Sequence, residues 1–62
     1  MKNVVDRMTM YDDRMLVYHI EVRKVMEHYE TYVDGDFWAS ADNRMEVEED
    51  IKDLASRYNL KK

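Results

Sequence analysis

The sequence predicts an α+β fold, in which one C-terminal amphipathic α-helix packs on a small antiparallel β-sheet. Asp34-Gly35 lies between two runs rich in aromatic and β-branched residues, which is the strongest short-range signal for a β-hairpin. Apolar residues after Asn43 then recur at helical spacing. The 62 residues (1–62) are expected to form a single small domain.

Residues 1–13 allow two interpretations. One side of a short helix would carry Val4, Val5, Met8 and Tyr11. Thr9 and the Asp12-Asp13 pair interrupt that helix. A loose arm that packs late, or packs against a second subunit, therefore fits this segment equally well.

Residues 14–27 favour a strand over a helix. Period-two alternation is carried by Leu16, Tyr18, Ile20 and Val22. Helical spacing would use Met15, Tyr18, Val22, Val25 and Tyr29, with Asp12 or Asp13 as the cap. The content of valine, isoleucine and tyrosine decides for the strand. One long bent strand, or two strands joined by a bulge or tight bend near residues 24–26, would explain why no glycine, proline or asparagine follows.

The register of the hairpin at Asp34-Gly35 has two possible forms. A two-residue loop pairs Val33 with Asp36 and Tyr32 with Phe37, whereas a three-residue loop pairs Tyr32 with Asp36 and Thr31 with Phe37. We favour the three-residue loop because it separates the side chains more cleanly. One face would then hold Tyr29, Thr31, Phe37, Ala39 and Ala41, and the other His28, Glu30, Tyr32, Trp38 and Ser40.

The C-terminal helix begins after Asp42 or Asn43, and either residue is a good N-cap. Asn43 and Glu46 have the spacing of a capping box. The apolar stripe consists of Val47, Ile51, Leu54, Ala55 and Tyr58. Cations that suit the C-terminal end of the helix dipole are Arg57, Lys61 and Lys62.

The acidic residues are concentrated in one block. The net charge is −4, from 14 acids and 10 bases, but residues 27–53 hold ten acids against only Arg44 and Lys52. On the expected helix, Glu46, Glu49, Asp50 and Asp53 share one face, and Asp34, Asp36 and Asp42 add charge beside it. Such a surface could imitate nucleic-acid phosphates and occupy the binding site of a basic, DNA-binding protein.

Two considerations weigh against mimicry. Duplex DNA carries about seven charges over the roughly 12 Å spanned by residues 46–53, whereas this stretch has five acids less Lys52. The acids also fit an ordinary solvated helix face, with Glu48–Lys52 and Asp53–Arg57 as pairs. Mimicry would need the turn acids or a second copy, and a small domain without cysteine is in any case expected to form a homodimer.

In the favoured register Trp38 and Tyr32 share the face away from the helix, where exposed aromatics are typical of partner anchors. Residues 1–13 or a second subunit could equally cover them. The alternative function is therefore a structural or regulatory module that associates through its sheet, with the acids serving solubility.

Catalysis and cofactors find no support in the sequence. Ser40 and Ser56 have no recognisable base nearby, and one glycine cannot build a phosphate-binding loop. His19 and His28, each two residues from a glutamate, are read as surface histidines rather than metal ligands because no third soft ligand exists. We expect no enzyme, no metal and no cofactor. Direct nucleic-acid binding is not expected either, because the net charge is negative.

In general character the whole chain resembles the small acidic inhibitor proteins that bacteriophages make to disable host machinery, with no shared motif. That resemblance implies host takeover by binding, in some cases by DNA mimicry. We find no signal-peptide core and no apolar run of membrane-spanning length, and expect a cytoplasmic protein, in the host cytoplasm if phage-encoded.

Overall fold

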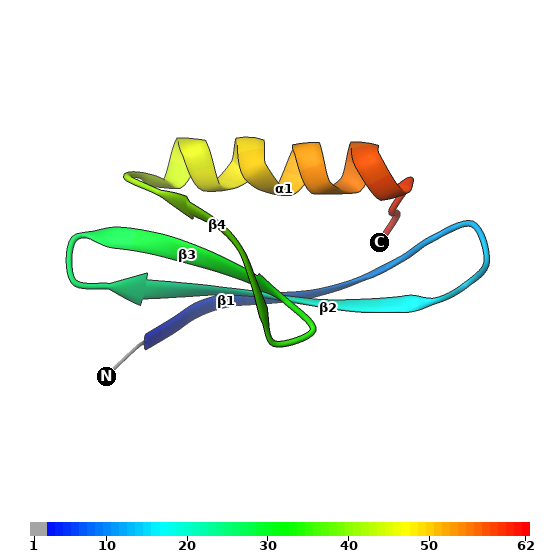
Figure 1. Cartoon of the computed structure of the whole chain (residues 1–62), viewed down its shortest axis with the longest axis horizontal. Helices are drawn as coiled ribbons and strands as arrows, with labels where there is room; N and C mark the ends of the chain where they lie inside the picture. Colours follow the sequence, from blue (N-terminus) through cyan, green and yellow to red (C-terminus); the bar gives the residue numbers. More distant parts are fainter. Residues whose placement is uncertain (1–2) are drawn as a thin grey trace.

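The computed structural model describes residues 3–62 and contains a four-stranded antiparallel sheet with one helix across it (Figure 1). The strands are adjacent in chain order, and α1 lies over one face of the sheet while the other face stays open. The predicted α+β class is confirmed. The elements are β1 Asn3–Tyr11, β2 Val17–Val25, β3 His28–Val33, β4 Asp36–Ala41 and α1 Arg44–Tyr58.

The first half of the chain consists of two nine-residue strands, β1 and β2. Residues 3–11, for which the sequence left a helix or an arm open, form an edge strand, and residues 1–2 lie outside the described part. The strand predicted within residues 14–27 is confirmed, and of the alternatives left open for its end the structure has two strands joined by a tight turn. Met26 and Glu27 make a two-residue turn into β3, with Met26 at φ 56°.

The β3–β4 hairpin has the two-residue loop. Asp34 and Gly35 both have positive φ, 51° and 87°, as a type I′ turn requires. Val33 pairs with Asp36 and Tyr32 with Phe37, so the three-residue loop that we favoured is wrong. A bulge follows at once, because Thr31 pairs with Ala39 and Trp38 is left as the extra residue.

The two-residue loop exchanges the expected positions of Phe37 and Trp38, because it pairs Phe37 with Tyr32. Trp38 packs against the core beneath the helix, with its ring 6.1 Å from that of Tyr58. Phe37 instead meets Tyr32 edge-on at 5.9 Å on the open face. The prediction that Trp38 and Tyr32 share an exposed face is therefore wrong. The expected placement of Thr31, Ala39 and Ala41 on one face survives because the bulge restores their register.

The core lies between α1 and one face of the sheet, in two adjoining clusters. The first is built on Met10, Ile20, Leu54 and Leu60, and the second on Val22, Ala41 and Val47. Ile20, Val22 and Leu54 are at most 1% exposed. The predicted helix stripe thus faces the sheet, and the small Ala41 allows α1 to approach β4 closely.

Both ends of α1 are capped, the first by a side chain and the second by backbone groups. The Asn43 side chain accepts a hydrogen bond from the Glu46 backbone N–H at 2.9 Å, which confirms the predicted N-cap. At the other end Asn59 adopts a left-handed conformation, φ 53°, and the Leu60 N–H donates to the Ala55 carbonyl at 2.8 Å. This reversal turns Leu60 into the core.

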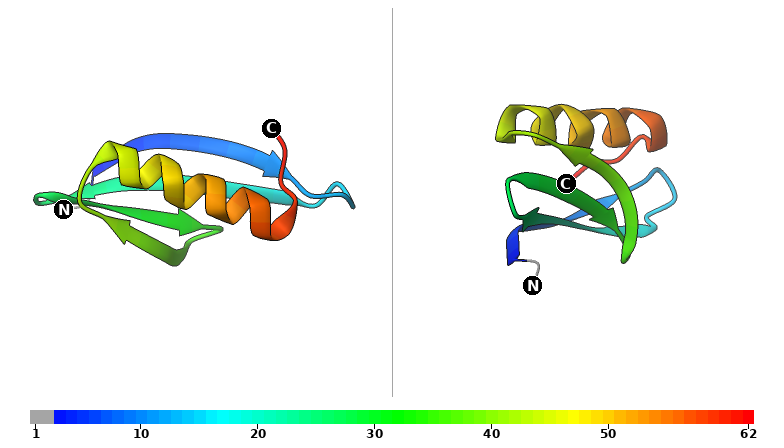
Figure 2. Two further views of the ribbon diagram at one scale, coloured as in Figure 1. Left: turned by 90° about the horizontal axis from the view of Figure 1, so that it is seen from above. Right: turned by 60° about the vertical axis from the view of Figure 1, so that its left-hand side comes forward.

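The C-terminal residues then pair with the last residue of β1 at its outer edge. Lys61 exchanges two backbone hydrogen bonds with Tyr11, of 2.7 and 2.8 Å. Figure 2 shows this last segment descending from the helix towards β1. Further along the same edge, the Asp6 carboxylate accepts a hydrogen bond from the Arg7 N–H at 2.9 Å. Backbone groups that could pair with another strand are therefore partly occupied.

The strained turn at Met26 gives a first prediction. Met26→Gly should raise the free energy of unfolding by about 1 kcal/mol, because glycine accepts positive φ without a steric penalty. Met45→Gly is the matched control: Met45 is also exposed but lies in α1, so the same change should cost about 1 kcal/mol. Urea denaturation of the two variants measures both effects. A loss of stability in Met26→Gly would show that the positive φ of Met26 does not strain the turn.

The role of the C-terminal turn gives a second prediction. Leu60→Ala should lower the free energy of unfolding by about 2 kcal/mol or more, since Leu60 is only 7% exposed within the core. Leu16, 57% exposed in the β1–β2 loop, is the control, and Leu16→Ala should change stability by less than about 0.5 kcal/mol. Equal effects in thermal denaturation would show that the last turn does not hold the core.

Candidate binding surface

The two flanks of α1 differ in charge. On the flank towards β1, Arg44, Glu48 and Lys52 line a groove of about 430 Å³ beside the core methionines. On the flank towards β4, helical spacing places four acids, which we call the acidic face. The acidic face consists of Glu46, Glu49, Asp50 and Asp53. Its position beside β4 follows from Arg57, which pairs with Asp53 at 3.0 Å and lies 5.9 Å from the Trp38 ring.

The four acids of this face have different surroundings. Glu46 accepts a hydrogen bond from the Asp42 N–H at 3.4 Å, so it stabilises the helix N-terminus. The expected Asp53–Arg57 pair is present, whereas the expected Glu48–Lys52 pair is not among the ion pairs of the described residues. Within the same residues, no basic side chain forms an ion pair with Glu49 or Asp50.

Asp50 is the most unusual member of the acidic face. Its Oδ2 atom is buried and has no hydrogen-bond partner within residues 3–62. Burial raises the pKa of Asp50 above its ordinary value, and the charges of Glu46, Glu49 and Asp53 raise that pKa further. The ionised carboxylate therefore costs free energy that a cation placed beside it would reduce.

The two acids of the β3–β4 hairpin, Asp34 and Asp36, lie at a hollow on the same side of the molecule. Asp34 and Asp36 line a hollow of about 280 Å³ together with Trp38 and, from α1, Leu54 and Tyr58. Asp34 also has a structural role, because its Oδ1 accepts a hydrogen bond from the His19 N–H at 3.0 Å. Asp36 is exposed. We call this feature the aromatic hollow, since Tyr18, Trp38 and Tyr58, whose rings pack together, are among the residues that line it.

The structure thus brings most of the predicted partner-binding residues to one side of the molecule. Tyr32 is the exception and lies on the opposite face of the sheet. The β4 side collects Asp34, Asp36, Trp38, Asp42 and the acidic face. Tyr32 lies on the open sheet face and is 8% exposed, because the Arg23 guanidinium covers its ring at 4.0 Å. Its hydroxyl donates to Glu30 at 2.7 Å.

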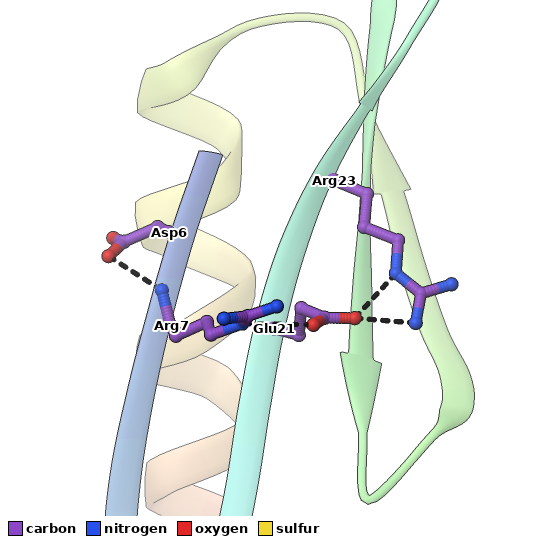
Figure 3. Close-up of polar contacts among 4 residues, drawn as sticks. All are labelled: Asp6, Arg7, Glu21 and Arg23. Carbon is purple, nitrogen blue, oxygen red and sulfur yellow. Dashed lines mark hydrogen bonds and ion pairs between the residues drawn. The ribbon is translucent and has the colours of Figure 1, made fainter. Parts of the chain in front are cut away.

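A charged network on the open sheet face was not predicted from the sequence. Glu21 accepts hydrogen bonds from Arg7, at 3.2 Å, and from Arg23, and thereby joins β1 to β2 (Figure 3). The hydrogen bond from Arg23, with that from Arg7, holds the pKa of Glu21 below its usual range. Arg7 and Glu21 are direct cross-strand neighbours, a relation that only the register reveals.

Neither a metal site nor a similar known protein indicates a function for this surface. His28 lies 3.4 Å from Glu30, and within residues 3–62 no group of three or more His, Cys, Asp or Glu side chains is arranged to hold a metal ion. No helix of the described chain is long and apolar enough to cross a membrane. Searches against protein-family models, curated proteins and solved structures returned no significant match.

The surroundings of Asp50 give a third prediction. Because folding raises its pKa, ionised Asp50 destabilises the fold above that pKa, and Asp50→Asn should add about 0.5 kcal/mol at pH 7. The gain should vanish as pH falls through the pKa of Asp50, because the protonated wild-type side chain is neutral too. Glu48→Gln, the same charge change on the β1 flank, should give no gain. Urea titrations from pH 7 to pH 3 measure the stability of each variant. A gain in Asp50→Asn that does not depend on pH would show that the ionisation of Asp50 is not its cause.

Proposed function

We propose that the chain is a non-enzymatic binding protein that uses its acidic face to block a basic, nucleic-acid-binding protein, in the manner of the bacteriophage inhibitors it resembles. The observation that carries this proposal is the state of Asp50. Its buried, unpartnered oxygen lies among three like charges, so the fold holds a surface that is electrostatically unfavourable by itself. A basic partner would convert that cost into binding free energy.

The extent of the surface sets how close such mimicry can be. The 15-residue helix is about 22 Å long, and duplex DNA would present about 13 charges over that length. The β4 side offers seven acids less Arg57, about half that density. Two copies side by side would approach the density of DNA, and we therefore include a homodimer in the proposed active form.

The contacts of the arginines on the open face favour binding through the acids of the protein rather than binding of nucleic acid through its basic residues. Arg7 and Arg23 both bond to Glu21, and Arg23 also lies on the Tyr32 ring. The Arg23 guanidinium is held between Glu21 and the Tyr32 ring, and Glu21 offsets part of the positive charge that the two arginines would offer to nucleic-acid phosphates. Direct binding of nucleic acid is accordingly not part of the proposed function.

The open face supports a second candidate function, association through the sheet. The specific observation is Phe37, which is 57% exposed beside Tyr32. In this alternative Phe37, rather than Trp38, is the apolar anchor, and the acids keep the chain soluble. Phe37→Ser would abolish binding under this alternative and leave it intact under the primary proposal.

The primary proposal predicts binding that depends on the position of the acids. The immobilised protein should retain basic proteins from a bacterial lysate at low salt, and added duplex DNA should release them. Neutralising Glu46, Glu49 and Asp50 together (E46Q/E49Q/D50N) should reduce retention at least about tenfold, because three charges leave the contact. Quantitative mass spectrometry of the retained proteins measures this.

The control removes the same three charges elsewhere. The exposed residues Asp6, Asp13 and Glu27 lie on β1 and in two turns away from the acidic face. The variant D6N/D13N/E27Q should keep its retention within about twofold, since none of its three charges belongs to the proposed contact and exposed charges outside a contact are screened by salt. Equal losses in the two triple variants would show that net charge alone governs retention, and would refute a defined acidic face.

A further inference from the structure

The aromatic hollow combines packed aromatic rings with surrounding carboxylates. Three of its rings pack on one another: Tyr18 and Tyr58 are stacked with centroids 6.2 Å apart, and Trp38 meets Tyr58 at 6.1 Å. The rings come from β2, β4 and α1, so the folded chain brings together residues far apart in sequence. Ring faces carry a negative electrostatic potential, which attracts cations.

Carboxylates surround these rings. Asp34 and Asp36 line the hollow itself, and Asp12 accepts a hydrogen bond from the Tyr18 hydroxyl at 3.4 Å. The burial of Tyr18 and the charges of Asp12 and Asp34 raise the pKa of its hydroxyl. The Tyr18 hydroxyl is neutral at physiological pH, and the two charged residues that line the hollow, Asp34 and Asp36, are both anionic.

A neighbouring arginine, Arg57, indicates the chemistry that the hollow accepts. Its guanidinium lies 5.9 Å from the Trp38 centroid while its Nε bonds to Asp53. A planar guanidinium stacks on aromatic faces and loses less hydration than an ammonium when it does so. The hollow beyond Arg57 repeats the same combination of ring and carboxylate, with no guanidinium among the residues that line it.

We propose that the aromatic hollow binds an arginine side chain of the partner protein, with the guanidinium on the rings of Trp38 and Tyr58 and paired with Asp36. This inference rests on the proposed function and supplies what the acidic face lacks. The β4 side as a whole has about half the charge density of DNA and attracts basic surfaces in general, whereas a ring-lined hollow selects one side chain by shape and charge. The hollow thus provides the specific anchor beside a diffuse electrostatic contact.

The chain carries its own reporter for this binding, because Trp38 is its only tryptophan. Titration of the full protein with N-acetyl-arginine methylamide at low salt should change Trp38 fluorescence in a saturable way, with a dissociation constant in the millimolar range. The matched ligand is N-acetyl-citrulline methylamide, which has nearly the same shape and no charge. It should bind at least about fivefold more weakly.

Two protein variants locate the site. Asp36→Asn should weaken arginine binding about threefold, and Tyr58→Leu should weaken it by about threefold or more through loss of a ring. Tyr58 is 47% exposed, and far-UV circular dichroism will show that the variant is folded. The control is Glu27→Gln, which removes one acidic charge at the β2–β3 turn, at the opposite end of the sheet from the β1–β2 loop (Figure 1). It should leave the affinity unchanged.

Equal responses to arginine and citrulline, or equal losses in Asp36→Asn and Glu27→Gln, would overturn the arginine site. The two proposals can fail separately. If E46Q/E49Q/D50N loses its basic partners while arginine does not bind the wild-type hollow, the acidic face stands without this anchor. If arginine binds as expected but neutralising the acidic face changes nothing, the hollow stands and the proposed function does not.

Discussion

The register of β4 is the constraint on which the rest of the structure depends. The type I′ turn at Asp34-Gly35 pairs Val33 with Asp36, and an uninterrupted ladder from there would place Ala39 opposite Glu30, on the open face. The extra residue Trp38 prevents this and returns Ala39 and Ala41 to the side of the helix. Small side chains then meet α1, and the indole fills the space at its edge.

Elements with local signals could be predicted from the sequence. The Asp34-Gly35 turn, the alternation in β2 and the capped helix each depend on residues within a few positions of one another. The bulge at Trp38 could not be predicted, because its benefit appears only when the helix is in place above β4. β1 was missed for a similar reason: its own irregularity between Val4 and Asp6 breaks the alternation that marks a strand.

The candidate binding surface also has one part that local sequence signals predict and one part that they do not. The acidic face follows from helical periodicity alone, so its four members could be assigned before the fold was known. The aromatic hollow draws on Tyr18, Trp38 and Tyr58, whose proximity depends on the sheet register and on helix placement. Tyr32 shows the converse, since nothing in the sequence indicates that Arg23, on the neighbouring strand, would cover its ring.

The bonds between Tyr11 and Lys61 also affect how the chain folds. The three hairpins of the meander join neighbouring segments and require little loop closure, whereas this bridge connects the first strand to the C-terminal residues. Because this pairing needs α1 in place and the chain reversal at Asn59, we expect it to form after the meander. A contact that is absent from the folding transition state affects the unfolding rate rather than the folding rate. We therefore expect the bonds between Tyr11 and Lys61 to slow the opening of the β1 edge at Tyr11.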